Sequence, residues 1–389
     1  MSQPRPALPI EPFSVRVADE VLGDLRARIR NTRWPDPAPG RAWGQGTDLA
    51  WLRRVLAWWA DEFDWRAQER HLNTFSHFRA ELDGVRVHFV HQRAPRGQGL
   101  PLILSHGWPS TFVELLPLVP LLTEPQAHGI DGPAFDVVIP SLPGYGFSQR
   151  PARTGVNYRY VAGLWHRLMR GLGYERYGAQ GGDFGAGVAT FMALDDPQPM
   201  LGVHLSTLEI APYTGPGSRP LSEAERAYLA AMRHWEQTEG GYKAIQSTKP
   251  QTLGYGLNDS PVGLAAWILE KWRAWADSGG DPMARFPRDL LGTTLTIYWA
   301  TQTITPSMRD YFDNRWHRVA PGPNDFVGVP TAVAVFANHF VPEGDPPREL
   351  LERLYDVRRW TPMPSGGHFA AAEEPQRLAA DIAAFFAAL

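Results

Sequence analysis

The first eighty residues have the hydrophobic periodicity of helices. Apolar residues recur at helical spacing after Asp19, which we expect to be the N-cap of a helix that ends before Trp34. A second helix is predicted over residues 49–63, where Trp, Leu and Val side chains share one face. A loop rich in proline and glycine separates the two. Residues 1–80 are therefore predicted to form a mainly helical arm that packs on the rest of the chain.

From Phe78 onward the pattern becomes that of β-strands. Polar and apolar residues alternate on both sides of Asp83 and Gly84, which predicts a β-hairpin. Later strands are expected in short apolar runs, several of which end in turns rich in glycine and proline. These runs are PLILSHGW, FDVVIPSLPG, VHLSTLEI and PTAVAVFAN. Because helical stretches lie between the runs, the pattern predicts an α/β fold with a doubly wound, mostly parallel sheet.

A long helical segment interrupts this alternation. Between about Ala211 and Pro321 the chain is rich in tryptophan, and the strand pattern is missing. This segment is predicted to be a cap inserted between two parts of the sheet domain. The expected organisation is an arm over 1–80, the first part of the core over 81–210, the cap over 211–321 and the second part of the core over 322–389.

Charge and composition favour a small-molecule partner. The chain has 38 basic and 41 acidic residues and so lacks the broad field that attracts nucleic acid or an anionic membrane. It has no cysteine, which excludes disulfides, thiolate nucleophiles and Cys-ligated zinc. No apolar run approaches the roughly 18 residues of a membrane helix, and no signal-peptide pattern is present. We expect a cytoplasmic protein that uses no metal or cofactor; its oligomeric state stays open, a homodimer included.

The segment YGAQGGDFGAGVA has the glycine spacing of a nucleophile elbow, in which a strand turns sharply into a helix and presents one side chain. The residue at the nucleophile position is Asp183, where a serine is more usual. A carboxylate attacks a saturated carbon, and the ester that results then has its carbonyl on the enzyme. The substrate is therefore expected to be an alkyl electrophile with a leaving group, such as an epoxide or an alkyl halide.

Two other segments fall where an α/β-hydrolase places its active-site groups. HGWP follows a predicted strand, and GGHFAAAEEP lies near the C-terminus. The backbone N–H groups of Trp108 and Phe184 are the expected oxyanion hole. His368 follows Asp183 in the chain order of this fold and is expected to activate the water that hydrolyses the ester.

The cap distinguishes between the two electrophiles. An epoxide leaves as an alkoxide and needs a proton donor, which Tyr242, Tyr255 and Tyr311 in the cap offer. A halide site of this type would be expected to use a tryptophan directly after the nucleophile, where this chain has Phe184. The cap therefore favours an epoxide.

The chain resembles epoxide hydrolases of the microsomal type almost from end to end. The resemblance rests on IEPFSVRV, NTRWPD, YGAQGGDFGAGVA, STKPQTLGYGLNDSPVGLAAWILEKW and GGHFAAAEEPQRLAADI. It implies an α/β-hydrolase fold, with Asp183 as nucleophile and His368 as base. It also implies that Tyr242 and Tyr311 polarise the epoxide oxygen, whereas Tyr255 lies outside the family's two tyrosine positions. Membrane-anchored members have a helix before the arm, and we expect this chain to be a soluble, bacterial member.

One position departs from the family pattern. After the strand PTAVAVF the family places an acid that supports the histidine, and this chain has His339 there. Histidine cannot supply the negative charge that stabilises an imidazolium. Glu343 is our candidate for the replacement, because a turn at Gly344 would let its side chain reach back. Asp345 is the second candidate, although it is also suited to cap the next helix.

Several alternatives remain open at this stage. The same residues would serve an epoxide-opening cyclase, a haloalkane dehalogenase or a binding protein without turnover. Trp108 and Phe184 are expected to line the pocket, which favours small apolar or aromatic epoxides. Four cap tryptophans either extend that pocket or pack the cap helices; these are Trp267, Trp272, Trp275 and Trp299. The composition suggests a GC-rich bacterial genome, in which antibiotic biosynthesis and detoxification are both expected roles.

Overall fold

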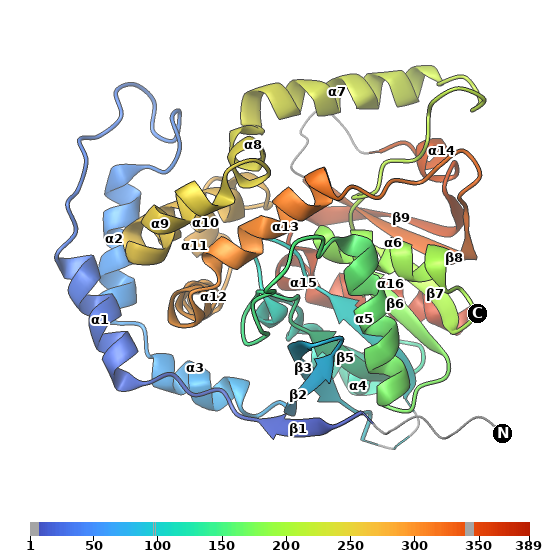
Figure 1. Cartoon of the computed structure of the whole chain (residues 1–389), viewed down its shortest axis with the longest axis horizontal. Helices are drawn as coiled ribbons and strands as arrows, with labels where there is room; N and C mark the ends of the chain where they lie inside the picture. The colour runs from blue at the N-terminus through green and yellow to red at the C-terminus, as the bar shows by residue number, and fades with distance from the viewer. Residues whose placement is uncertain (1–7, 96, 98, 339–345) are drawn as a thin grey trace.

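The computed structural model, which describes residues 8–95, 97, 99–338 and 346–389, is built around one nine-stranded sheet (Figure 1). The strands lie in the order β1-β2-β3-β5-β4-β6-β7-β8-β9. Their bounds are β1 (Ile10–Phe13), β2 (His77–Leu82), β3 (Val85–Gln92), β4 (Leu100–Ser105), β5 (Phe135–Pro140), β6 (Tyr177–Gly181), β7 (Met200–Leu205), β8 (Val327–Asn338) and β9 (Tyr355–Gly367). The pairs that join β1, β2, β3 and β5 are antiparallel, and all the others are parallel.

Helices cover both faces of the sheet. On one face α5 packs on α6, which also contacts β4, β6, β7 and β8; on the other, α4 packs on α16. Every residue of β5 is buried, as expected for a strand covered on both sides. The predicted α/β-hydrolase fold is therefore confirmed. The core helices are η1 (Phe112–Leu115), α4 (Leu118–Thr123), η2 (Pro125–His128), α5 (Tyr158–Gly171), α6 (Phe184–Asp195), α14 (Arg348–Leu351), α15 (Ala370–Glu373) and α16 (Pro375–Ala387).

Two strands escaped the sequence interpretation. β1 has four residues and contains Pro12, so it is too short to show alternation, and its position at the sheet edge tolerates the proline. β9 contains Pro362 and Pro364 and pairs with β8 through several register shifts, which hides its periodicity. β9 is also an edge strand.

The arm contains α1 (Asp19–Arg30), α2 (Leu49–Asp61) and α3 (Trp65–Leu72) together with β1. The N-cap of α1 is Ala18, so the prediction that Asp19 caps this helix was wrong; Asp19 is its first residue. The predicted arm boundary at residue 80 falls inside β2. The arm packs on the cap: the Trp51 indole N–H donates to Asp281, and the Trp59 indole N–H donates to Thr296.

The chain between β7 and β8 forms a layer of helices beside the core (Figure 1). These are α7 (Glu223–Glu239), α8 (Gly241–Gln246), α9 (Pro250–Asp259), α10 (Pro261–Ala274), α11 (Pro282–Arg285), α12 (Arg288–Thr301) and α13 (Ile304–Trp316). α10 contacts α1 and α2 of the arm, and α12 contacts α3. The cap is therefore held between the arm and the core.

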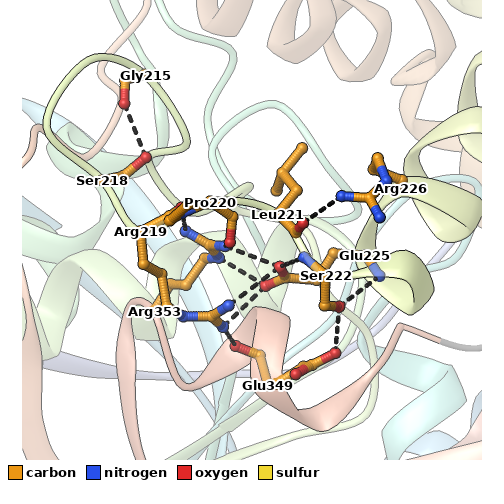
Figure 2. A network of polar contacts seen from close by, with 10 residues as sticks. All are labelled: Gly215, Ser218, Arg219, Pro220, Leu221, Ser222, Glu225, Arg226, Glu349 and Arg353. Atoms are coloured by element: carbon orange, nitrogen blue, oxygen red, sulfur yellow. Dashed lines mark hydrogen bonds and ion pairs between the residues drawn. The ribbon is translucent and has the colours of Figure 1, made fainter.

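An ion-pair network joins the start of the cap to the core (Figure 2). The side chain of Glu225, at the first turn of α7, is completely buried and accepts from Arg353 at 2.6 and 2.7 Å and from Arg219 at 2.9 and 3.1 Å. These arginines, Arg353 first, hold the pKa of Glu225 at about 2. Ser222 caps α7 and donates to Glu349 on α14. The network fixes α7 against the segment that follows residues 339–345.

Candidate active site

Asp183 lies at a sharp turn between β6 and α6. Its backbone has φ 50° and ψ −130°, a strained conformation for a residue with a side chain, and its N–H donates to Thr207 Oγ1 at 2.6 Å. The flanking glycines make the turn sterically possible. A Cβ at Gly185 would lie 2.0 Å from the carbonyl oxygen of Ser105, and one at Gly181 would lie 2.2 Å from the carbonyl oxygen of Gly185. The glycine spacing in the sequence is thus a requirement of the elbow.

One oxygen of the Asp183 carboxylate faces two backbone amides. Oδ1 accepts from the N–H of Trp108 at 2.9 Å and from the N–H of Phe184 at 2.7 Å. The approach depends on Gly107, since a Cβ there would lie 2.2 Å from Oδ1. These are the two N–H groups that the sequence indicated, and the structure brings them to the same atom. Such a pair can stabilise negative charge that develops on this oxygen.

The other carboxylate oxygen faces His368. Nε2 of His368 lies 3.3 Å from Oδ2, and the imidazole side chain is buried. Burial lowers the pKa of His368, but the hydrogen bond to Asp183 and its charge raise it, and the resulting pKa lies above the ordinary value. The cap also contacts this residue. The backbone N–H of His368 donates to the carbonyl of Trp275 at 2.9 Å, and the imidazole and indole rings meet edge to face.

Two cap tyrosines pack against the side chains of Trp108 and Phe184, whose N–H groups hold the carboxylate. Tyr242 on α8 stacks on the Trp108 indole with 5.6 Å between centroids and 8° between planes. Tyr311 on α13 meets Trp108 at 5.6 Å and Phe184 at 4.8 Å, edge to face in both cases. The centroids of the two tyrosine rings are 5.9 Å apart. Tyr255, by contrast, is 71% exposed on α9.

Burial keeps both phenols in their protonated form. The pKa of Tyr242 lies well above the ordinary tyrosine value, because of burial first and then the negative charge of Asp183. Burial likewise raises the pKa of Tyr311, and Tyr242 and Asp183 add to the effect. Near neutral pH both hydroxyls therefore carry a proton that they can donate to an oxygen held above Asp183.

Comparison with known proteins gives one consistent answer. A family profile described as "Epoxide hydrolase N terminus" matches residues 10–115, and one for the α/β-hydrolase fold matches residues 101–239. A candidate epoxide hydrolase from Stigmatella aurantiaca is 40% identical over 96% of this chain and 84% of its own length. Epoxide hydrolase 1 of Sus scrofa is 35% identical over 98% of this chain and 89% of its own. The chain belongs to the epoxide hydrolase family.

A solved structure agrees with this assignment. The epoxide hydrolase of Aspergillus niger superposes with a TM-score of 0.82 at 31% identity, covering 97% of this chain and 96% of that one. In the part of this chain that the structure describes, no helix is both long and apolar enough to cross a membrane. Within the same residues no cluster of three or more His, Asp or Glu side chains is arranged to hold a metal ion.

The position of the family's supporting acid lies outside the described residues. His339, Glu343 and Asp345 all belong to the segment 339–345, so the assignment of Glu343 stays a prediction. Another acid, which the sequence did not single out, lies close by. Burial raises the pKa of Glu114 to about 7. The negative charge of Glu114 in turn helps to raise the pKa of His368.

Behind the carboxylate is a small polar cavity of about 20 Å³, enough for one water molecule. Its walls include Asp183, His368, Glu114 and Gln180. The Oε1 atom of Gln180 is buried and accepts no hydrogen bond from any residue in the described ranges. A water in this cavity would lie among Gln180, Glu114 and the histidine.

On the other side of Phe184 and Tyr311 a groove of about 880 Å³ opens between the cap and the core. Both apolar and charged side chains line it, and α7 forms one side. Tyr158 and Glu209 also line it, with the Tyr158 hydroxyl donating to Glu209 at 2.5 Å. The groove gives a route from solvent to the rings of Phe184 and Tyr311.

The four cap tryptophans divide into two pairs. Trp275 contacts Trp108, Tyr242 and His368 edge to face and so belongs to the site. Trp272 stacks on Phe369 beside it, with 4.0 Å between centroids. Trp267 instead donates to Gln246, and Trp299 lies against Arg28 of the arm. Of the two alternatives left open by the sequence, packing of the cap describes Trp267 and Trp299.

Proposed function

We propose that this enzyme opens an epoxide to a vicinal diol through a covalent ester on Asp183. The observation that carries the proposal is the environment of this one carboxylate. One oxygen accepts from two backbone N–H groups and the other faces His368; two partly buried phenols lie near enough for the charge of Asp183 to raise their pKa values. Nucleophile, oxyanion donors, base and proton donors are thus present together.

The first half-reaction forms the ester. Oδ2 of Asp183 attacks a ring carbon, the bond between that carbon and the epoxide oxygen breaks, and the electron pair goes to the oxygen. Tyr242 and Tyr311 donate hydrogen bonds to that oxygen and supply the proton that it needs. The backbone amides of Trp108 and Phe184 hold the carboxylate for the attack through Oδ1.

The second half-reaction hydrolyses the ester. His368 takes a proton from water, and the oxygen of that water adds to the carboxyl carbon of Asp183. The negative charge then falls on Oδ1, where the two N–H groups already point. Collapse breaks the bond to Oδ2, which leaves with the diol and takes the proton from His368. The second proton of the water, now on the Asp183 carboxyl, restores the phenol that protonated the epoxide oxygen, so Asp183 is again a carboxylate. Glu343 is proposed to support the imidazolium during this step.

The substrate is proposed to be a small apolar or aromatic epoxide. The rings of Trp108, Phe184, Tyr242 and Tyr311 surround the carboxylate, and flat apolar molecules pack well against such surfaces. A halide would need an indole N–H donor directly after the nucleophile, and Phe184 supplies none there.

A single turnover in water labelled with oxygen-18 tests the mechanism. The first diol should contain unlabelled oxygen from Oδ2, and the label should appear in Asp183. Replacing His368 with Gln should leave the ester in place, as an adduct detectable by mass spectrometry of the Asp183 peptide. Label in the first diol, with none in Asp183, would show that water opens the ring directly.

A further inference from the structure

Lys271 is a buried cation among the aromatic rings of the site. Its side chain is only 7% exposed and projects from α10, one turn before Trp275. Nζ lies 4.5 Å from the centroid of the Tyr242 ring and 5.7 Å from that of the Trp275 ring. Burial of an ammonium group costs free energy unless other interactions compensate. A position against the ring of a proton donor suggests that the charge serves the reaction.

Glu270, its neighbour in sequence, holds the ammonium in place. The Glu270 carboxylate pairs with Nζ at 2.5 Å and is 23% exposed, so it is the more exposed partner. The lysine therefore has a carboxylate on one side and the rings of Tyr242 and Trp275 on the other. The ammonium group of Lys271 is therefore held against the Tyr242 ring.

We propose that Lys271 is a positioning residue that speeds opening of the epoxide by stabilising the negative charge that Tyr242 acquires as it donates its proton. This inference rests on the proposed function. A cation is attracted to the π-electrons of an aromatic ring, and a ring that bears a developing phenolate attracts it more strongly. The stabilisation is thus greater in the transition state than in the ground state, which is the condition for faster chemistry.

The other charged groups around Tyr242 act in the opposite direction. Its pKa lies well above the ordinary value because of burial first, and then because of the charges of Asp183, Glu209 and Glu270. Each of these carboxylates disfavours negative charge on the phenol. Lys271 offsets them from the ring face. Without that cation the phenol would be a weaker donor, and ring opening would be slower.

The two half-reactions should respond differently. Tyr242 assists only while the epoxide oxygen leaves, so the loss of Lys271 should slow ester formation. Ester hydrolysis depends on His368 and the backbone amides and should keep its rate. A purely structural role for Lys271 would affect both steps alike.

The test uses single-turnover kinetics, with ester measured by mass spectrometry and by the fluorescence of the tryptophans at the site. Lys271→Met and Lys271→Gln remove the charge, and Lys271→Arg keeps it. The matched control is Lys249→Met, because Lys249 is exposed at the start of α9. Lys271→Met is also combined with Tyr242→Phe, which removes the hydroxyl through which Lys271 acts. Thermal unfolding is recorded for every variant.

We expect Lys271→Met and Lys271→Gln to slow ester formation about 10- to 30-fold, the effect of a desolvated cation–π contact. Lys271→Arg should recover most of the rate, and Lys249→Met should behave as wild type. In the Tyr242→Phe background Lys271→Met should cause no further loss. Stability should change little, because Glu270, the partner left behind, is 23% exposed and can be hydrated.

Three results would overturn the inference: no slowing, equal slowing of both half-reactions, or the same loss with and without the Tyr242 hydroxyl. Unfolding of both charge-removing variants would also overturn it, since the role would then be structural. Wild-type enzyme that forms no ester on Asp183 would refute the proposed function and this inference together. Normal ester formation with an unaffected Lys271→Met would refute this inference alone.

Discussion

The Nε2 atom of His368 lies 3.3 Å from Oδ2 of Asp183. In the free enzyme the carboxylate keeps the pKa of this histidine above its ordinary value despite burial. Ester formation removes the negative charge of Asp183, and with it the main interaction that favours the imidazolium. Burial, which lowers the pKa, then dominates. Ester formation therefore favours the neutral form of the histidine, which the next step, ester hydrolysis, requires as its base.

This relationship predicts the pH dependence of the second step. Since hydrolysis needs neutral His368, its rate should fall as the pH drops through the pKa of the ester form. That pKa should lie below the pKa of His368 in the free enzyme, which the carboxylate raises. Single-turnover hydrolysis between pH 5 and 9 would give the first value, and an NMR titration of His368 the second. Equal values would show that Asp183 does not control the histidine.

The cap tyrosines should act on ester formation. Tyr242→Phe and Tyr311→Phe should each slow that step by about 10²- to 10⁴-fold, the usual effect of a positioned acid. The double variant should be close to inactive, because no phenol would remain to protonate the oxygen. Tyr255→Phe is the control, since its side chain is 71% exposed. Loss of activity in Tyr255→Phe would show that the wrong tyrosines have been assigned.

Glu343 should matter for the second half-reaction. Glu343→Gln would remove the charge that we propose stabilises the imidazolium of His368, so the ester should form at the normal rate and persist. Asp345→Asn is the matched control and should change little. Rapid quenching and mass spectrometry of the Asp183 peptide would measure the ester. Wild-type hydrolysis in Glu343→Gln would leave another carboxylate, with Glu114 the first to test, in this role.

The ring-lined pocket should favour aryl epoxides over short aliphatic ones in kcat/KM. Each extra CH₂ of apolar contact contributes about 0.8 kcal/mol. Trp275→Leu should reduce the preference, because this indole contacts Trp108 and Tyr242. Trp299→Leu removes an indole that packs on the arm and should leave the preference unchanged. Measuring kcat/KM over a matched series of aryl and aliphatic epoxides gives the preference. Equal kcat/KM for aryl and aliphatic epoxides would contradict the pocket assignment.

The buried network at the start of the cap should make stability depend on pH. Glu225→Gln leaves Arg353 buried without its charge partner, which should cost about 3 kcal/mol of unfolding free energy near pH 7. The pKa of Glu225 is lowered, so this contribution is present above about pH 4.5 and disappears as the pH falls toward 2. Glu352→Gln, in an exposed ion pair, is the control. Equal denaturation midpoints for Glu225→Gln and wild type would contradict this.

The elbow could be predicted because its geometry is local. The glycines around Asp183 are needed within a few residues of the turn, and the two amides follow from the same turn and from Gly107. The glycine spacing, together with the HGWP segment and the place of His368 in the chain order, is therefore enough to indicate the nucleophile and its oxyanion donors. The cap tyrosines needed the family resemblance, because nothing local separates them from Tyr255.

What the sequence did not show depends on packing between distant segments. Gln180 and Glu114 are ordinary polar residues until neighbouring elements enclose them beside His368. Lys271 did leave a signal, since it interrupts the apolar face of α10 that Ile268 and Trp275 continue. A lysine in such a stripe could have been flagged from the sequence, but its partner ring could not, because α8 meets α10 only in the folded cap.

The arm has a consequence for the traffic of substrate and product. β1 pairs with β2 at the edge of the sheet, while α1 and α2 hold the cap through contacts with α10 (Figure 1). The network of Glu225 and Arg353 fastens the opposite end of the cap. The groove of about 880 Å³ between α7 and the core gives a route that needs no movement of the cap, so its width should limit the size of the epoxides that are turned over.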